Sequence, residues 1–214
     1  TAGFALVSLL IINILAFTVA YLLTKGIKGS NIFRTVFFMP NLIGGIVLGY
    51  IWSMIFDGIL SRYNTSILLN STYGFWGLII LMSWQQIGYM MIIYIAGLQA
   101  VPGDMLEAAK IDGASEWKTL WDIIIPNVMP SITICTFLTL TNSFKLYDQN
   151  LALTNGRPYN GAIHTTEMLA LNIVNSNTLK TKGIGQAKAV MFFVLVAIIG
   201  IFQMKSTHDK EVQQ

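Results

Sequence analysis

Charged residues are scarce in this chain of 214 residues. Only 11% of them are Asp, Glu, Lys or Arg, whereas a soluble domain carries about 25% charged residues. Hydrophobic residues make up 54% of the sequence, and the formal net charge is only +3. The Lys and Arg residues are scattered and do not form the basic, aromatic patch that follows a phosphate backbone. The composition therefore indicates a membrane protein and argues against nucleic acid as a partner.

Cysteine and histidine are also nearly absent. The single cysteine, Cys135, lies in an apolar run, so no disulfide can form within the chain and a small buried thiol is the simplest interpretation. His164 and His208 lie far apart in the sequence, without Cys or carboxylates at metal-ligand spacing. We therefore expect no metal site and no cofactor bound by this chain.

Long apolar runs account for most of the sequence. About 20 mainly apolar residues suffice for a helix to cross the hydrocarbon layer, and backbone groups in lipid must be paired within such a segment. The sequence therefore predicts an all-α, polytopic membrane protein that forms a single membrane domain over residues 1–214. The five expected transmembrane helices lie at residues 2–23, 35–56, 75–101, 123–144 and 183–204, the last interrupted by Lys188.

Prolines and glycines fall in or beside two of these runs. Pro40 is followed by Gly44 and Gly45, and Pro126 by Pro130. Because proline lacks an N–H and clashes with the preceding turn, we expect the helices to kink or break at these places.

The basic residues give an orientation. Lys25, Lys28 and Arg34 lie between the first and second runs, against only Arg62 between the second and third. The positive-inside rule therefore places the first connection in the cytoplasm, and alternation puts residues 102–122 and the C-terminal tail there too. The stretch from residue 145 to 183 would lie outside. It also contains basic residues, but the rule is weak for long connections.

The segment between the third and fourth runs has the most informative pattern. Asp104 and Glu107 have the spacing of a capping pair, and Gly113 can adopt the positive φ that ends a helix. Ser115 can cap a second helix, which we expect to end or bend at Pro126. The segment predicts a helix-turn-helix, with an amphipathic connector that rests on the bilayer as the alternative. The apolar face of the second helix would consist of Trp117, Leu120, Trp121 and Ile124.

This segment resembles a known motif. Glu107-Ala108-Ala109, Gly113 and Ile123 with Ile125-Pro126 resemble the EAA loop of ABC importer permeases, which forms their coupling helices. Ile125 replaces the usual Leu. The resemblance implies that residues 102–125 dock on a separate cytoplasmic ABC ATPase dimer, where ATP and Mg act. The docking residues would be Glu107, Ala108, Ala109, Asp112 and Gly113.

Other stretches are similar to the maltose-type sugar permeases. They are residues 34–40, Trp84 to Tyr89, and residues 153–158, where Arg157 departs from a usual Gly. The resemblance covers the whole chain and implies a binding-protein-dependent sugar importer of the bacterial inner membrane. Its partners would be a second permease subunit, normally a paralogue, and an extracytoplasmic solute-binding protein. Such permeases normally have one more span before Thr1, so we expect six in the full chain.

A sugar offers hydroxyl groups and no charge, so its path should be lined by neutral polar and aromatic side chains. Two helix faces meet this description, although such residues also serve as hydrogen-bonding links between helices. The candidate path residues are Trp84, Gln85, Gly88 and Tyr89 on the third run and Thr139, Asn142 and Ser143 on the fourth.

Two other classes of protein fit less well. An ion-coupled secondary carrier generally needs carboxylates within the membrane or broken-helix ion sites, yet the first, third and fourth runs contain no acidic residue. A membrane enzyme would need a nucleophile with its base or paired carboxylates in the spans. The phosphate-loop lookalike at residues 156–161 is followed by Ala162, where lysine is required. We therefore expect a transport subunit without its own ATPase site.

Overall fold

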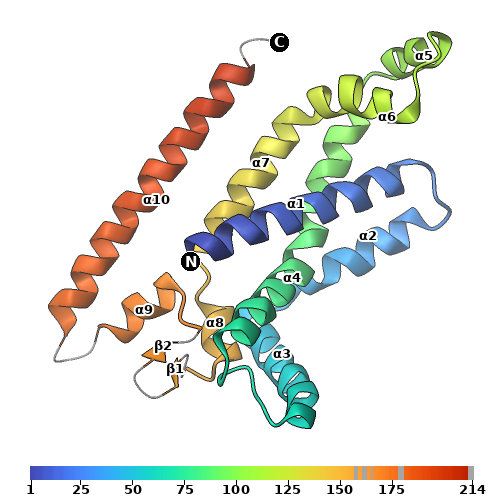
Figure 1. Cartoon of the computed structure of the whole chain (residues 1–214). Coiled ribbons are helices and arrows are strands. Elements are labelled where there is room, and N and C mark those ends of the chain that lie inside the picture. Colours follow the sequence, from blue (N-terminus) through green and yellow to red (C-terminus); the bar gives the residue numbers. More distant parts are fainter. Residues whose placement is uncertain (157–158, 161–162, 165, 178–180, 212–214) are drawn as a thin grey trace.

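The computed structural model describes residues 1–156, 159–160, 163–164, 166–177 and 181–211, with only the backbone described at 159–160, 163–164 and 202–211. Helices dominate these residues (Figure 1). The first half of the chain contains α1 (Ala2–Thr24), α2 (Ser30–Phe38), a 3-10 turn (Met39–Leu42), α3 (Gly45–Leu60), a second 3-10 turn (Ser61–Tyr63) and α4 (Ser71–Gln99). The second half contains α5 (Gly103–Ile111), α6 (Glu116–Thr119), a π-helical turn (Leu120–Ile124), α7 (Ile125–Phe144), α8 (Asp148–Leu153), the antiparallel strands β1 (Tyr159–Asn160) and β2 (Ile163–His164), α9 (Leu169–Asn175) and α10 (Lys182–Glu211).

Four helical segments of the described chain are long and apolar enough to cross a membrane. They are Ala2–Thr24, Ser71–Gln99, Glu116–Phe144 and Lys182–Ile201, and the bent pair Ser30–Leu42 and Gly45–Tyr63 adds a fifth when it counts as one span. This agrees with the predicted all-α, polytopic architecture.

The predicted break at Pro40 is confirmed. The helix axis turns by 98° between Ser30–Leu42 and Gly45–Tyr63, with Pro40 inside the 3-10 turn and Gly44 at the start of α3. A break within a membrane leaves backbone carbonyls without helical partners. One of them, the carbonyl of Ile43, accepts a 3.2 Å hydrogen bond from Nε2 of Gln85 on α4. The polar side chain of α4 therefore stabilises the break.

Of the two outcomes predicted at Pro126, an end or a bend of the helix, the end does not occur. Helical structure runs on from α6 through Pro126, which lies in the first turn of α7, to Phe144. The residues just before Pro126 form the π-helical turn Leu120–Ile124. A π turn widens the helix by one residue, which gives the proline ring room beside the preceding carbonyls. The side chain of Asn127 also donates a 2.7 Å hydrogen bond to the carbonyl of Ile123.

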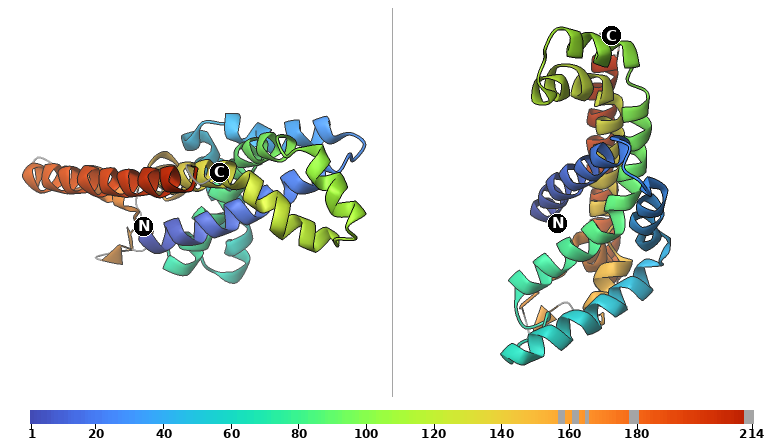
Figure 2. Two further views of the ribbon diagram at one scale, coloured as in Figure 1. Left: turned by 90° about the horizontal axis from the view of Figure 1, so that it is seen from above. Right: turned by 90° about the vertical axis from the view of Figure 1, so that its right-hand side faces the viewer.

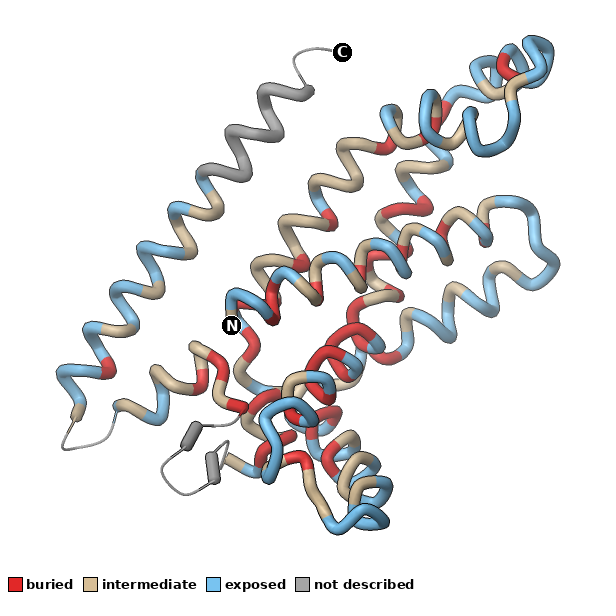
Figure 3. Tube along the Cα trace, in the orientation of Figure 1, coloured by how far each residue is buried: buried red, intermediate tan, exposed pale blue. Residues whose placement is uncertain are grey.

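Helix α4 forms the centre of the fold. It packs against α1, α2, α3 and α7. In its most apolar stretch 67% of the residues are buried, against 28% in that of α1 and 6% in that of α10. Buried residues cluster along α4 accordingly (Figure 3). Gly88 allows a very close approach, because a Cβ there would collide with the carbonyl of Phe37 at the end of α2. The backbone of α4 therefore supports the bent span directly.

Two other elements complete the arrangement. The short helix α8 lies on α3 at Gly49, where a Cβ would come within 2.8 Å of Cβ of Ala152. Helix α10 contacts α7 and α9 but otherwise stands apart from the remaining helices (Figures 1 and 2). Its apolar side chains are mostly exposed in the isolated chain, so they require lipid or another subunit as cover.

Candidate functional site

The α5–α6 loop projects beyond the ends of α4 and α7 at one end of the molecule (Figure 1). Helix α5 starts four residues after α4 ends, and α6 continues into α7 through the π turn. Between α5 and α6, Gly113 has a φ of +71°, and Oγ of Ser115 accepts a hydrogen bond from the backbone N–H of Lys118 at 3.3 Å. The predicted helix-turn-helix, its glycine stop and its serine cap are therefore confirmed.

The predicted capping pair of Asp104 and Glu107 does not form. Helix α5 begins at Gly103 with Pro102 as its N-cap, and no side chain caps it. Asp104 instead lies inside the first turn. There its carboxylate still meets the positive end of the helix dipole, so the acidic residue favours the helix start by charge and not by a cap hydrogen bond.

The loop presents most of its predicted docking residues to the outside. Glu107, Ala108, Asp112 and Gly113 are exposed, whereas Ala109 is buried. The sequence analysis missed Ile111, whose side chain is 85% exposed beside them. The exposed side of the loop therefore combines carboxylates with an apolar side chain.

The residues of the predicted apolar face of the second helix differ in their exposure. Ile124 is buried, but Trp117 and Trp121 are 69% and 52% exposed and contact each other edge to face at 5.8 Å between ring centroids. Tryptophan is enriched where a membrane protein meets the headgroup layer. The exposed rings at the start of α6–α7 are therefore of the type that lies at a headgroup layer.

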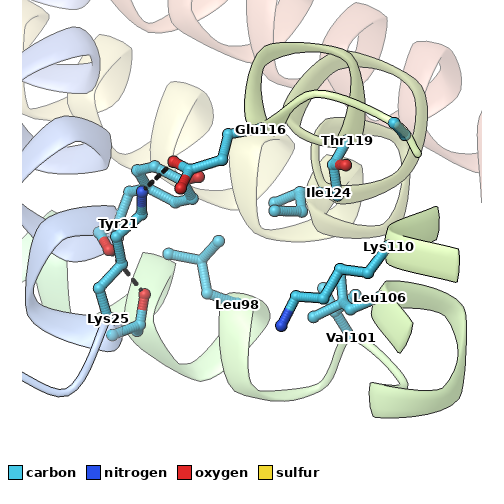
Figure 4. A pocket seen from close by; sticks show the side chains of 11 residues that line it. Tyr21, Lys25, Leu98, Val101, Leu106, Lys110, Glu116, Thr119 and Ile124 are labelled. Atoms are coloured by element: carbon cyan, nitrogen blue, oxygen red, sulfur yellow. Dashed lines mark hydrogen bonds and ion pairs between the residues drawn. The ribbon is translucent and has the colours of Figure 1, made fainter. Parts of the chain in front are cut away.

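Glu116, at the start of α6, has a partner within the chain. Its Oε2 lies 2.6 Å from Nζ of Lys25, just after α1, and the ammonium lies 4.8 Å from the ring centroid of Tyr21 (Figure 4). The hydrogen-bonded carboxylate raises the pKa of Lys25. Both side chains are well exposed, so the pair adds little to stability. It connects α6 to the end of α1.

Within the membrane region, neutral polar side chains link three helices. Tyr94 on α4 donates a 2.7 Å hydrogen bond to Oδ1 of Asn13 on α1. Nδ2 of Asn13 donates to Oγ1 of Thr139 on α7 at 3.3 Å, and Oγ of Ser143 donates to the carbonyl of Thr139 at 2.7 Å. Thr139 and Ser143 are fully buried. The sequence analysis missed Asn13 and Tyr94, although Asn13 is the only amide in its apolar run.

A second group of side-chain amides joins α4 to α7 and α8. Gln149 on α8 donates a 2.8 Å hydrogen bond through Nε2 to Oε1 of Gln85, and Nδ2 of Asn142 donates to Oε1 of Gln86 at 3.3 Å. The structure thus places the predicted Gln85 and Asn142 beside two amides, Gln86 and Gln149, that the sequence analysis did not select. Their spacing in the sequence gave no sign of this contact.

The other candidate path residues lie in different surroundings. Trp84 is 44% exposed and contacts Trp52 edge to face at 5.7 Å between centroids. Gly88 is buried at the contact of α4 with Phe37, and Tyr89 is half-buried against the core. The four predicted path residues of α4 therefore do not line one common space.

Among the described residues, no group of three or more His, Cys, Asp or Glu could hold a metal ion. Arg157 and Pro158 of the predicted outer turn lie outside the described residues, as do Gly161 and Ala162 of the phosphate-loop lookalike. The turn that precedes them has Asn155 and Gly156 with φ of +50° and +69°.

Comparison with known proteins identifies the family. Residues 4–205 match the binding-protein-dependent transport system inner membrane component. The chain belongs to this family. It is a multi-pass permease subunit of an ABC transporter in the inner membrane, and it is not itself an enzyme, because the ATPase of these transporters is a separate subunit. Nothing in these comparisons supports an ion-coupled carrier.

Its relatives include transport system permease proteins from several organisms. It is 42% identical, over 100% of this chain and 75% of the relative, to a probable starch degradation products transport system permease protein, AmyD, of Thermoanaerobacterium thermosulfurigenes. It is 30% identical, over 96% of this chain and 72% of the relative, to the trehalose/maltose permease protein MalF of Thermococcus litoralis. Among solved structures, a bacterial alginate ABC transporter in complex with an alginate pentasaccharide-bound periplasmic protein has a TM-score of 0.78 at 17% identity, over 94% of this chain and 74% of that one.

Replacement of Asn13 by Leu tests the link between α1, α4 and α7. The variant leaves the hydroxyls of Tyr94 and Thr139 without their partner, and we expect a loss of about 1 kcal/mol in unfolding free energy. Thermal unfolding in detergent, followed by tryptophan fluorescence, measures the loss. Thr18→Val is the matched control, because Thr18 is exposed on α1 and bonds only to Ile14 of its own helix. Equal melting temperatures for the two variants would contradict the assignment.

Proposed function

We propose that this chain is the permease subunit of an importer for a sugar or oligosaccharide. The observation that supports this substrate class is the neutrality of the central helices. Helices α1, α4 and α7 contain no charged residue, yet hydroxyl and amide side chains connect them. Such surroundings fit an uncharged solute with many hydroxyls, and relatives carry names such as starch degradation products and trehalose/maltose permeases.

The proposed assembly contains more than this chain. Residues 1–214 form one membrane permease domain, paired with a second permease subunit of the same family, a paralogue by the usual arrangement. An extracytoplasmic solute-binding protein delivers the sugar, in line with the family description and the periplasmic protein in the alginate transporter structure. A cytoplasmic ABC ATPase dimer binds ATP and Mg, and this chain binds no cofactor.

In the proposed mechanism, residues 102–125 dock on the ATPase through Glu107, Ala108, Ala109, Asp112 and Gly113. The loop is joined to α4 by a connection of three residues and to α7 without a break. A displacement of the loop therefore moves the ends of both helices that carry the neutral polar groups. ATP can drive this movement only if the loop binds differently to the open and closed ATPase.

Gly113→Val tests the coupling role. The left-handed φ of Gly113 is unfavourable for a β-branched residue, but a Cβ there would meet no atom within 4 Å. We expect a folded protein whose loop turn is distorted, with ATP hydrolysis retained and uptake reduced at least about tenfold, which corresponds to about 1.4 kcal/mol of lost coupling. Both rates are measured in proteoliposomes that contain the assembled transporter.

The matched control is Gly103→Ala in the same loop. A Cβ at Gly103 also meets no atom within 4 Å, and its φ is not in the left-handed region, so this variant should keep its ratio of uptake to hydrolysis. Unchanged uptake in Gly113→Val would count against the docking role of the loop.

The double variant Tyr89→Ala and Ser143→Ala tests the proposed path. Removal of an aromatic face and a hydroxyl should weaken sugar transport, with a higher KM for uptake and unchanged basal ATP hydrolysis. Tyr50→Ala removes an exposed tyrosine from α3 and serves as the control. Uptake with the wild-type KM in the double variant would remove these two residues from the path.

A further inference from the structure

A cavity of about 470 Å³ lies between the α5–α6 loop and the ends of α1 and α4 (Figure 4). Leu98, Val101, Leu106 and Ile124 provide its apolar part. Charged side chains occupy two sides. The Lys25–Glu116 pair lies on one side, and Lys110 extends from α5 into the cavity on the other.

These charges leave the cavity positive. Glu116 neutralises Lys25 at 2.6 Å, whereas no carboxylate of the described residues lies within 4.0 Å of the ammonium of Lys110. The cavity therefore has one positive charge without a direct counterion, next to apolar side chains. This combination suits a ligand that has an anionic group attached to an apolar body.

A second, larger cavity continues from the first. Its volume is about 590 Å³, and it shares Tyr21 and Glu116 with the first cavity. It follows α1 past Phe17 and Ile14 and is closed on the other side by α6 and α7. The side chains that line it are predominantly apolar, including Leu120, Trp121, Ile125 and Ile132. The two cavities together form a groove with a cationic end and a long apolar end.

The cationic end of the groove adjoins side chains of the type found at a membrane surface. Trp117 and Trp121 line the second cavity, which meets the cationic end at Glu116 and Tyr21, and tyrosine, tryptophan and lysine are the residues that mark the headgroup layer. The apolar end points along α1 and α7, which are both apolar enough to span the membrane. Along the groove, a cationic end is followed by an apolar end, and a phospholipid likewise has a charged headgroup followed by apolar acyl chains.

We propose that this groove binds one anionic phospholipid from the leaflet that faces the α5–α6 loop, with its phosphate at Lys110 and an acyl chain between α1 and α7. Charge complementarity selects an anionic headgroup over a zwitterionic one, because anionic lipid is attracted to lysine at the surface. A bound lipid would lie directly behind the coupling loop and would stiffen its contact with α1. The inference depends on the placement of the loop at the membrane surface and not on the solute that is transported.

Tryptophan quenching tests the lipid site directly. The assembled transporter is reconstituted into vesicles of phosphatidylcholine that contain either phosphatidylglycerol or phosphatidylcholine with the same brominated acyl chains. Bromine quenches tryptophan at contact, so we expect stronger quenching by brominated phosphatidylglycerol. The difference should vanish when Trp117 and Trp121 are both replaced by Phe.

Substitution of Lys110 identifies the anionic contact. Lys110→Gln should lower the preference for phosphatidylglycerol by about fivefold, which corresponds to about 1 kcal/mol per lysine near the surface, and Lys110→Arg should retain it. Lys118→Gln makes the same change in net charge in the same loop, at a side chain that does not itself line the groove, and should leave the preference unchanged.

Three results would overturn the proposal. Equal quenching by the two brominated lipids, or an equal effect of Lys118→Gln, would show that no anionic lipid is selected here. Absence of any quenching from Trp117 and Trp121 would show that a protein surface, such as the second permease, covers the groove. Loss of sugar uptake without loss of the lipid preference would affect only the proposed substrate.

Discussion

The requirement that every backbone polar group in lipid has a partner determines this fold more than any other constraint. It makes helices of the apolar runs, and it also explains the two irregular places. At the bent span, Gln85 supplies the hydrogen bond that the carbonyl of Ile43 loses. Before Pro126, a π-helical turn makes room for the proline ring, and Asn127 binds a carbonyl of that turn. Polar side chains in the spans are thus partly a consequence of irregular backbone.

The same polar side chains give the central helices two functions. Asn13, Tyr94 and Thr139 hold α1, α4 and α7 together, and the amides of Gln85 and Gln149 join α4 to α8. Neutral hydrogen bonds between helices are individually weak, so helices joined in this way can change their relative positions. A transporter that alternates between two states needs such contacts at its centre.

The features that depend on local chemistry could be predicted from the sequence. The lengths of the apolar runs predicted the spans, Pro40 with Gly44 predicted the broken helix, and Gly113 with Ser115 predicted the helix-turn-helix. Features that depend on distant contacts could not be predicted. The partner of Glu116 is Lys25, at a separation of 91 residues, and Gln149 meets Gln85 at a separation of 64. The helix does not end at Pro126, because the π turn accommodates the proline ring in a way that local rules for proline do not include. The Asp104 prediction was wrong because α5 starts directly after Pro102.

The central claim is that the α5–α6 loop docks on an ATPase and transmits its movement to the membrane helices. Cross-linking tests this claim most directly. The exposed Ala108 is replaced by Cys, and in the assembled transporter its thiol is labelled with a reagent that carries a photoreactive group, which is then activated by light. The native Cys135 is buried, so it does not compete. The account predicts a cross-link from residue 108 to the ATPase subunit, with a yield that changes when ATP is added. Labelling of residue 108 from the periplasmic side, or no cross-link to a nucleotide-hydrolysing subunit in any state, would contradict it.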